Sequence, residues 1–167
     1  MKRHLALTCL VVAAIALVVP GTATAAGRPE ITPFTGDIDL GNLNEGPTGD
    51  VCAFDVGLVV HFGAGARQIA FPDPLGSGAT SLLVGPLTAT VTNLETDDSL
   101  TVNISGPTFL DASGFIIKGT GAWLSFEPIA EGGLRYIHGR LAFEPAPYGL
   151  HAVVLGGVEE DLCDRLA

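Results

Sequence analysis

The chain has 167 residues, with 8 Lys and Arg against 18 Asp and Glu, which gives a formal net charge of −10 at pH 7. Apolar residues make up 47% of the chain and charged residues 16%, a composition that excludes a disordered tail. The negative charge disfavours nucleic acid and anionic membrane surfaces as partners. A chain of this length suits one domain.

The first 25 residues have the pattern of a secretory signal peptide. A Lys-Arg pair at residues 2–3 precedes an uncharged apolar run over residues 5–19, and small residues follow at 23–25. The run is shorter than the roughly 20 residues that a bilayer-spanning helix needs. We predict that residues 1–25 are cleaved, that no transmembrane segment remains, and that the protein is secreted to the extracellular space. An uncleaved signal anchor is the alternative.

Two of the three cysteines, Cys52 and Cys163, lie outside this segment and near opposite ends of the remaining chain. Two cysteines in an oxidising compartment allow one intramolecular pairing, so we predict a disulfide between them. Two separate buried thiols are the alternative. In the chain-entropy model, a bridge that closes a loop of about 100 residues stabilises the fold by about 4 to 5 kcal/mol.

Residues 26–50 are rich in Gly, Pro, Thr, Asn and Asp, and their scattered apolar residues keep no period of 2 or 3.6. This composition predicts an extended Gly/Pro-rich arm without an assigned helix or strand. The pattern changes at Cys52, where alternate apolar residues continue to residue 62 and predict a long strand with one apolar face. Residues 51–167 are predicted to form a single β domain.

Further alternating segments follow this first strand. The longer ones cover residues 87–94, 100–105, 115–126, 134–143 and 150–158, and shorter ones that add to the count cover residues 67–71, 81–84 and 109–110. Short turns with Gly, Pro or Asp join them, and no amphipathic helix separates them, which excludes parallel βαβ units. We predict an all-β fold, in which an antiparallel meander of seven or eight strands closes into a barrel to protect its edges; a β-sandwich is the alternative.

Two details complete the predicted fold. Gly119 and Gly121 lie two residues apart on one face of a long strand, where the missing side chains allow the sharp bend that a barrel needs. Residues 159–166 place acidic residues first and Arg165 near the end, as a short C-terminal helix prefers. Cys163 would then tie this helix to the first strand.

Five short strings carry a resemblance to known sequences. They are residues 52–56 (CAFDV), 90–94 (TVTNL), 100–107 (LTVNISGP), 119–123 (GTGAW) and 161–163 (DLC). These strings resemble those of a family of small exported, uncharacterised β-rich proteins of high-GC Gram-positive bacteria. The resemblance spans roughly residues 52 to 163 and implies export, β structure and the paired cysteines. That family has no established activity, so the resemblance implies no site.

No local pattern indicates a metal or cofactor site. His61, His138 and His151 are scattered, and neither C-x-x-C nor H-x-x-x-H spacing occurs. Asp37 and Asp39 begin like a calcium-binding loop, but a glycine stands where the third oxygen ligand belongs. We therefore predict no metal and no cofactor.

One strand carries the candidate site. Within residues 134–143, the side chains of Tyr136, His138 and Arg140 alternate on one face, and apolar residues occupy the other. One interpretation places the three polar side chains in solvent, as is usual for half-buried antiparallel strands. The other places them inside a barrel mouth, where they could orient an anionic or carbonyl-bearing ligand or supply acid/base chemistry.

Three functions from different classes remain. We favour a non-enzymatic binding or interaction module that holds a small apolar or anionic ligand or a protein partner. The alternatives are a small-barrel enzyme of isomerase or cyclase type that uses the three polar residues, and a structural envelope protein without a pocket. A partly polar cavity above roughly 300 Å³ would disfavour the last. An interior filled with apolar side chains would exclude a carrier that holds its ligand inside the protein, and would leave only recognition at the surface.

Overall fold

The computed structural model describes residues 29–72, 78–114, 116–147 and 149–167. The predicted signal peptide, residues 1–25, lies outside these ranges. Within them, no helix combines the length and the apolar character that crossing a bilayer requires.

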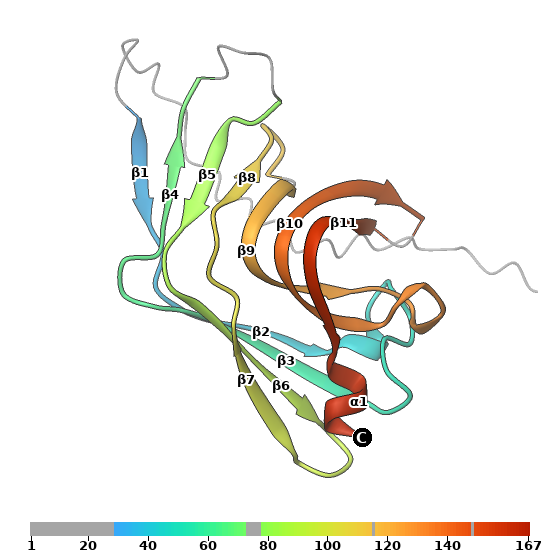
Figure 1. Ribbon diagram of the computed structural model, residues 1–167. Helices are drawn as coiled ribbons and strands as arrows, with labels where there is room; N and C mark the ends of the chain where they lie inside the picture. The colour runs from blue at the N-terminus through green and yellow to red at the C-terminus, as the bar shows by residue number, and fades with distance from the viewer. Residues whose placement is uncertain (1–28, 73–77, 115, 148) are drawn as a thin grey trace, which may run out of the picture.

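The described residues form two antiparallel sheets and one short α-helix (Figure 1). The larger sheet has seven strands, in the order β1 (Glu30–Pro33), β4 (Arg67–Ala70), β5 (Ser81–Val84), β8 (Thr108–Leu110), β9 (Ile116–Phe126), β10 (Leu134–Ala146) and β11 (Gly149–Asp161). The smaller sheet has four, in the order β2 (Gly36–Asn42), β3 (Val56–Phe62), β6 (Leu87–Asn93) and β7 (Ser99–Asn103). Short 3-10 turns are η1 (Leu43–Glu45) and η2 (Ile129–Glu131), and the helix is α1 (Leu162–Leu166). The all-β prediction is confirmed.

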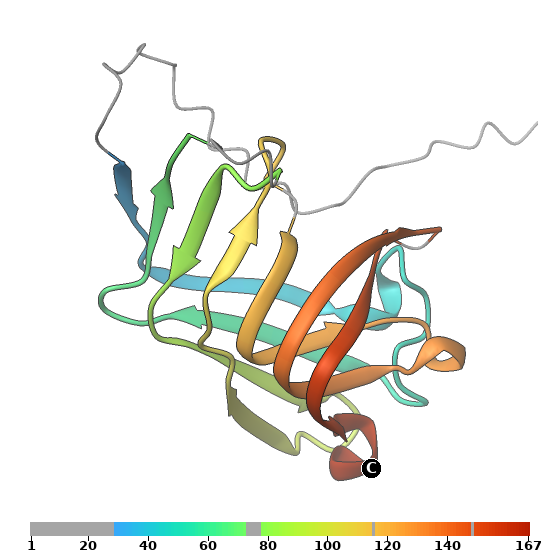
Figure 2. The same ribbon diagram turned by 45° about the horizontal axis from the view of Figure 1, so that its top comes forward.

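Several of these strands are halves of longer, bent strands. β1 continues into β2, β5 into β6 and β7 into β8, so that each crosses from one sheet to the other, and a turn within residues 63–66 joins β3 to β4 at the same place (Figure 2). The register carries on across the bend between β5–β6 and β7–β8, since Leu83 pairs with Thr108 on one side of it and Thr88 pairs with Asn103 on the other. When β1–β2, β3–β4, β5–β6 and β7–β8 are each taken together as one long strand, strands that follow one another along the chain are paired, which agrees with the predicted antiparallel meander.

Glycines lie where the last three strands bend. Gly121 pairs with Gly139, and Gly139 pairs with Gly157, so one row of glycines crosses β9, β10 and β11. A Cβ atom on Gly139 would overlap the carbonyl oxygen of Gly156, and one on Gly157 would overlap backbone of β10. Neighbouring backbones therefore approach too closely here for any side chain. The bend predicted at Gly121 is consistent with its φ of 105°.

Residues 30–42 belong to the sheets, which corrects the predicted arm over residues 26–50. β1 pairs with β4, and β2 pairs with β3. Both are edge strands whose residues are mostly exposed, and the half-buried ones are Thr32 of β1 and Ile38, Leu40 and Asn42 of β2. Edge strands with so little buried surface leave no sustained hydrophobic period in the sequence.

The main core lies between the four-stranded sheet and the covering layer of β9, β10 and α1. Its buried members are Leu43, Val51, Cys52, Val56, Leu58, Ala89, Val91, Val102, Leu134, Leu162 and Leu166. The apolar face predicted for the first strand points into this core through Val56 and Leu58. Apolar side chains thus fill the space between the layers.

A second, smaller core lies within the curve of β9, β10 and β11. Trp123, Ile137, Leu141 and Ala152 are its buried members, and Phe143 packs against them with its ring centroid 5.7 Å from that of Trp123. Gly119 makes room for the indole, because a Cβ atom there would overlap the Trp123 ring. This glycine therefore serves side-chain packing.

The predicted disulfide joins Cys52 to Cys163 across 111 residues, with 5.6 Å between the two Cα atoms. It ties the segment before β3 to α1. The helix is shorter than predicted, because residues 159–161 continue β11 and pair with β10. Asp161 caps the helix by accepting hydrogen bonds from the backbone N–H groups of Cys163 and Asp164.

Closure into a barrel is not established. Among the described residues, the pairings of β11 are with β10, and none joins it to β1 or β2. The disulfide, the packing of α1 and a backbone hydrogen bond from the N–H of Ile129 to the carbonyl oxygen of Asp50 connect the late part of the chain to the four-stranded sheet and the segment before β3. The barrel therefore stays a prediction.

Candidate functional site

The structure places Tyr136, His138 and Arg140 on one face of β10, as the alternation predicts. Tyr136 is partly buried against the main core, and the other two are exposed. The Tyr136 hydroxyl donates to the carbonyl oxygen of Asn103 at 2.7 Å and lies 2.8 Å from Nε2 of His138. The hydroxyl has a single proton, so Nε2–H of His138 must donate to the phenol oxygen.

The three residues do not form one constellation. Tyr136 and His138 are hydrogen-bonded, but among the described residues no hydrogen bond or ion pair connects Arg140 to them. Burial raises the pKa of Tyr136 above its ordinary value of 10.0, and the negative charge of Glu160 raises it further. The phenol is therefore neutral at physiological pH, with its proton held by a backbone carbonyl.

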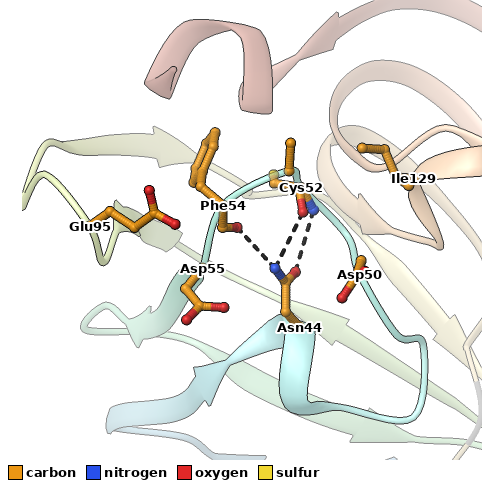
Figure 3. A pocket seen from close by; sticks show the side chains of 8 residues that line it. Asn44, Asp50, Cys52, Phe54, Asp55, Glu95 and Ile129 are labelled. Carbon is orange, nitrogen blue, oxygen red and sulfur yellow. Dashed lines mark hydrogen bonds between the residues drawn. The ribbon is translucent and has the colours of Figure 1, made fainter.

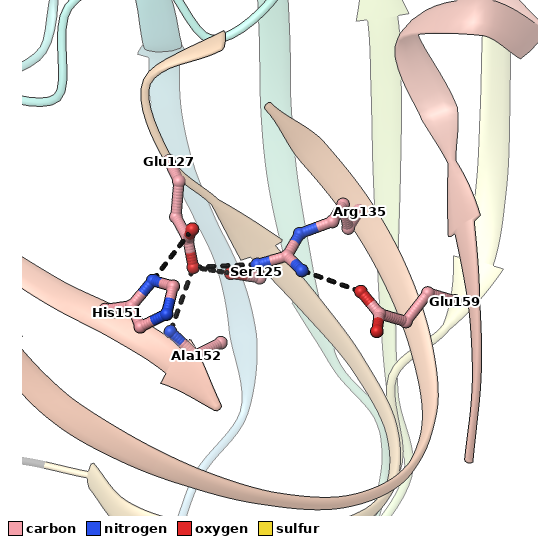
Figure 4. A network of polar contacts seen from close by, with 6 residues as sticks. All are labelled: Ser125, Glu127, Arg135, His151, Ala152 and Glu159. Atoms are coloured by element: carbon pink, nitrogen blue, oxygen red, sulfur yellow. Dashed lines mark hydrogen bonds and ion pairs between the residues drawn. The ribbon is translucent and has the colours of Figure 1, made fainter. Parts of the chain in front are cut away.

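A second group of polar side chains, which the sequence pattern did not reveal, surrounds Glu127 (Figure 4). Glu127 follows β9 and its side chain is fully buried, with 0% exposure. Its Oε1 accepts hydrogen bonds from the Ser125 hydroxyl at 3.0 Å, the Arg135 guanidinium at 3.0 Å and the backbone N–H of Ala152 at 2.9 Å. Its Oε2 lies 3.1 Å from Nδ1 of His151. We call these five residues the Glu127 network.

The network satisfies a charge that would otherwise be costly to bury. Arg135 is mostly buried too, with 18% of its side chain exposed, and its second terminal nitrogen donates to Glu159 at 2.6 Å. Because an ionised carboxylate can only accept hydrogen bonds, Nδ1 of His151 carries the proton that points at Oε2. Arginine, histidine and a backbone N–H thus converge on one carboxylate.

The network joins two segments that form the walls of a hollow. Glu127 and η2 belong to the connection between β9 and β10, whereas His151 and Ala152 lie on β11 near the tip of the next hairpin. The hollow has a volume of about 430 Å³, and we call it the His151 hollow. It is lined by Pro128, Ala130, Glu131, Glu144, Pro145, Ala146, Pro147 and His151.

A second hollow, of about 290 Å³, lies beside the disulfide (Figure 3). The Asn44 side chain holds its wall: Oδ1 accepts from the backbone N–H of Val51 at 2.9 Å, and Nδ2 donates to the carbonyl oxygen of Phe54 at 2.9 Å. Asp50, Asp55 and Glu95 are also among its lining residues. Since the Asn44 amide is used by backbone groups, this side chain fixes the loop that carries Cys52.

Neither hollow is lined by Tyr136, His138 or Arg140. Within the described ranges, no group of three or more His, Cys, Asp or Glu side chains is arranged to hold a metal ion. Asp37 and Asp39 lie on the edge strand β2.

Comparisons with known proteins leave the function to be argued from this geometry. No protein-family model, curated protein or solved structure matches the chain. The residues that the structure brings together around Glu127 and His151 are therefore the basis for a functional proposal.

Proposed function

We propose that the protein is an exported, non-enzymatic binding module and that the His151 hollow is its binding surface. The observation that carries this proposal is the Glu127 network, in which one buried carboxylate makes four contacts, and those to His151 and Ala152 connect the two walls of the hollow. A site whose walls are fixed before the partner arrives loses less conformational freedom on binding. The network thus supports a preorganised recognition surface.

The packing of the interior favours surface recognition over ligand carriage. Leu58, Leu134 and Leu162 are among the largest fully buried side chains, and they fill the main core where a carrier would need a cavity. The hollow of about 430 Å³ is in the size range of small-molecule and side-chain pockets, which disfavours a purely structural protein.

The lining indicates the chemistry of the partner. Three prolines and two alanines give rigid apolar walls, and the exposed Glu131 and Glu144 add negative charge. An Arg or Lys side chain would lay its aliphatic stem along such walls and place its charged end near the carboxylates. The proposed partner is a protein or peptide that presents a basic side chain. An anionic ligand would be repelled here.

The enzyme alternative has less support. The proton of Tyr136 is held by the Asn103 carbonyl, and the ring nitrogen of His138 that faces the phenol donates to it. A general acid or base must reach a substrate held beside it. Neither of the two hollows places a substrate next to this pair.

Export is part of the proposal. The basic start, apolar run and small residues of 1–25 support it, as does the disulfide between Cys52 and Cys163, since disulfides persist in oxidising compartments. The resemblance to small exported proteins of high-GC Gram-positive bacteria agrees with the same destination. Surface recognition does not depend on whether the meander closes into the predicted barrel.

The binding proposal is tested by NMR titration of the ¹⁵N-labelled protein with N-acetyl-arginine methylamide and with its uncharged isostere, N-acetyl-citrulline methylamide. The arginine probe should shift the amide signals of residues in both walls, which are Ala130, Glu131, Glu144, Ala146 and His151. The citrulline probe should bind at least about ten-fold more weakly, because it cannot form charge-assisted hydrogen bonds.

Matched variants test whether the preference for arginine comes from the carboxylates of the His151 hollow or from the negative charge of the protein as a whole. The double change Glu131→Gln/Glu144→Gln should remove the preference for arginine. Glu95→Gln, which removes one exposed carboxylate from the other hollow, should leave it unchanged. Equal binding of the two probes, or signals that shift only outside the His151 hollow, would overturn the proposal.

A further inference from the structure

The outer face of the four-stranded sheet carries a row of hydrogen-bonded side chains that is separate from both hollows. Nδ1 of His61 on β3 lies 2.8 Å from Oδ1 of Asp37 on β2. Nε2 of the same ring lies 3.0 Å from the Thr90 hydroxyl on β6, which lies 3.1 Å from the Thr101 hydroxyl on β7. One polar chain therefore crosses all four strands.

The strand register builds this row. Asp37 is directly opposite His61, and Thr90 is directly opposite Thr101. His61 reaches Thr90 diagonally, because Thr90 is paired with the residue two positions before the histidine. These four side chains alternate with core residues, so they point away from the main core. The row is accessible: the exposed fraction of the His61 side chain is 35% and that of Asp37 is 63%.

Donor and acceptor rules fix the direction of each hydrogen bond. The Asp37 carboxylate can only accept, so the proton of the neutral His61 ring lies on Nδ1. Nε2 is then an acceptor, and the Thr90 hydroxyl must donate to it. The Thr90 oxygen is left to accept the proton of the Thr101 hydroxyl. The Thr90 hydroxyl thus donates its proton to an imidazole that a carboxylate orients. Enzymes activate nucleophilic hydroxyl groups with this arrangement.

We propose that Thr90 is a nucleophilic hydroxyl that takes an acyl group from an activated ester, with His61 as general base and Asp37 as a positioning residue. The Thr90 oxygen forms a bond to the ester carbonyl carbon while its proton passes to Nε2 of His61. The tetrahedral intermediate then breaks its bond to the leaving phenol or thiol, which takes the proton from His61. The products are an acyl-threonine ester and the released phenol or thiol.

The sheet limits which acyl donors can react. β6 lies between β3 and β7, and its backbone N–H groups are used in the two ladders, so they are not free to stabilise an oxyanion. Amides and simple alkyl esters need that stabilisation, whereas aryl esters and thioesters have good leaving groups. The inference is therefore a self-acylation site for activated donors, and it does not depend on the proposed binding function.

The experiment treats the protein with p-nitrophenyl acetate and follows both p-nitrophenolate release and the acetyl group by mass spectrometry of the intact chain and its peptides. One acetyl group per chain should appear on Thr90. The isosteric change Thr90→Val should abolish it, and His61→Gln should slow it by about 100-fold or more. Thr92→Val, on the same face and strand but outside the row, should react like the wild type.

The Asp37→Asn variant tests whether Asp37 acts on the reaction by positioning His61 or only contributes to the fold. It should slow acetylation about ten-fold or more, because the imidazole loses the carboxylate that holds its ring, and Asp37→Glu, which keeps a carboxylate there, should restore most of the rate. Asp39 is the other charged side chain on that face of β2, so Asp39→Asn is the charge control. Acetyl groups found only at other residues, or equal rates for Thr90→Val and Thr92→Val in variants with wild-type thermal unfolding, would overturn the inference.

Discussion

Replacing Glu127 with alanine tests whether the buried network holds the late strands together. The side chain is fully buried and contacts four groups, including the mostly buried Arg135. Its removal leaves the guanidinium with Glu159, whose side chain is 41% exposed, and leaves the hydroxyl of Ser125 and the N–H of Ala152 without their acceptor.

The expected loss is large because the partners stay buried when the carboxylate goes. Breaking a buried ion pair from one side costs about 3 to 5 kcal/mol. For a domain of this size, that loss corresponds to a decrease in Tm of about 10 to 20 °C. Glu160→Gln is the control, because the Glu160–Arg165 pair is exposed on both sides and is expected to contribute less than about 1 kcal/mol.

The assay is equilibrium unfolding in urea, followed by tryptophan fluorescence, since the single tryptophan, Trp123, packs in the smaller core beside the network. Glu127→Ala should lower the midpoint without changing the slope. A free energy of unfolding within about 1 kcal/mol of the wild type, or a loss no larger than that of Glu160→Gln, would refute the reasoning.

Three further changes probe other parts of the fold. Replacing both Cys52 and Cys163 with alanine should lower the free energy of unfolding by about 4 to 5 kcal/mol, measured by urea unfolding, because the closed loop is long; an unchanged stability would argue against the bridge. Gly139→Ala should cost at least about 2 kcal/mol in the same assay, because the added methyl group overlaps backbone of β11. Gly57→Ala is its control, since that methyl group meets the flexible end of a leucine side chain, and a similar loss for both would contradict the close approach. The raised pKa of Tyr136 means that the folded state keeps the phenol proton more tightly than the unfolded state, so stability should fall as pH rises above about 10. Tyr136→Phe should show a smaller decline over that alkaline range, and an identical pH dependence would count against it.

Alternation in the sequence predicted most of the strands, because half-buried antiparallel strands show their buried face directly. Val56 and Leu58 illustrate this, since both point into the main core as the pattern from Cys52 predicts. β1 and β2 were missed because edge strands bury few residues. The pattern also ended β11 too early, at residue 158, because its last residues are acidic and exposed.

The candidate sites were harder to predict, because periodicity shows which residues share a face but not which faces come together. Glu127 and His151 are 24 residues apart in the sequence. They meet only because the paired strands β9, β10 and β11 curve strongly together. One signal was present: Trp123, Ser125 and Glu127 alternate, so an apolar face becomes polar at the end of its strand. For His61, the missing information was the register that places Asp37 and Thr90 beside it.

The most direct test of the proposed binding surface is the affinity of N-acetyl-arginine methylamide for the Glu127→Gln variant. This change leaves every residue that lines the His151 hollow in place and alters only the buried group that connects its walls. A preorganised hollow predicts a Kd raised by about ten-fold or more in a variant that NMR shows to be folded. An unchanged Kd in that folded variant would contradict the claim that the buried carboxylate shapes the binding surface.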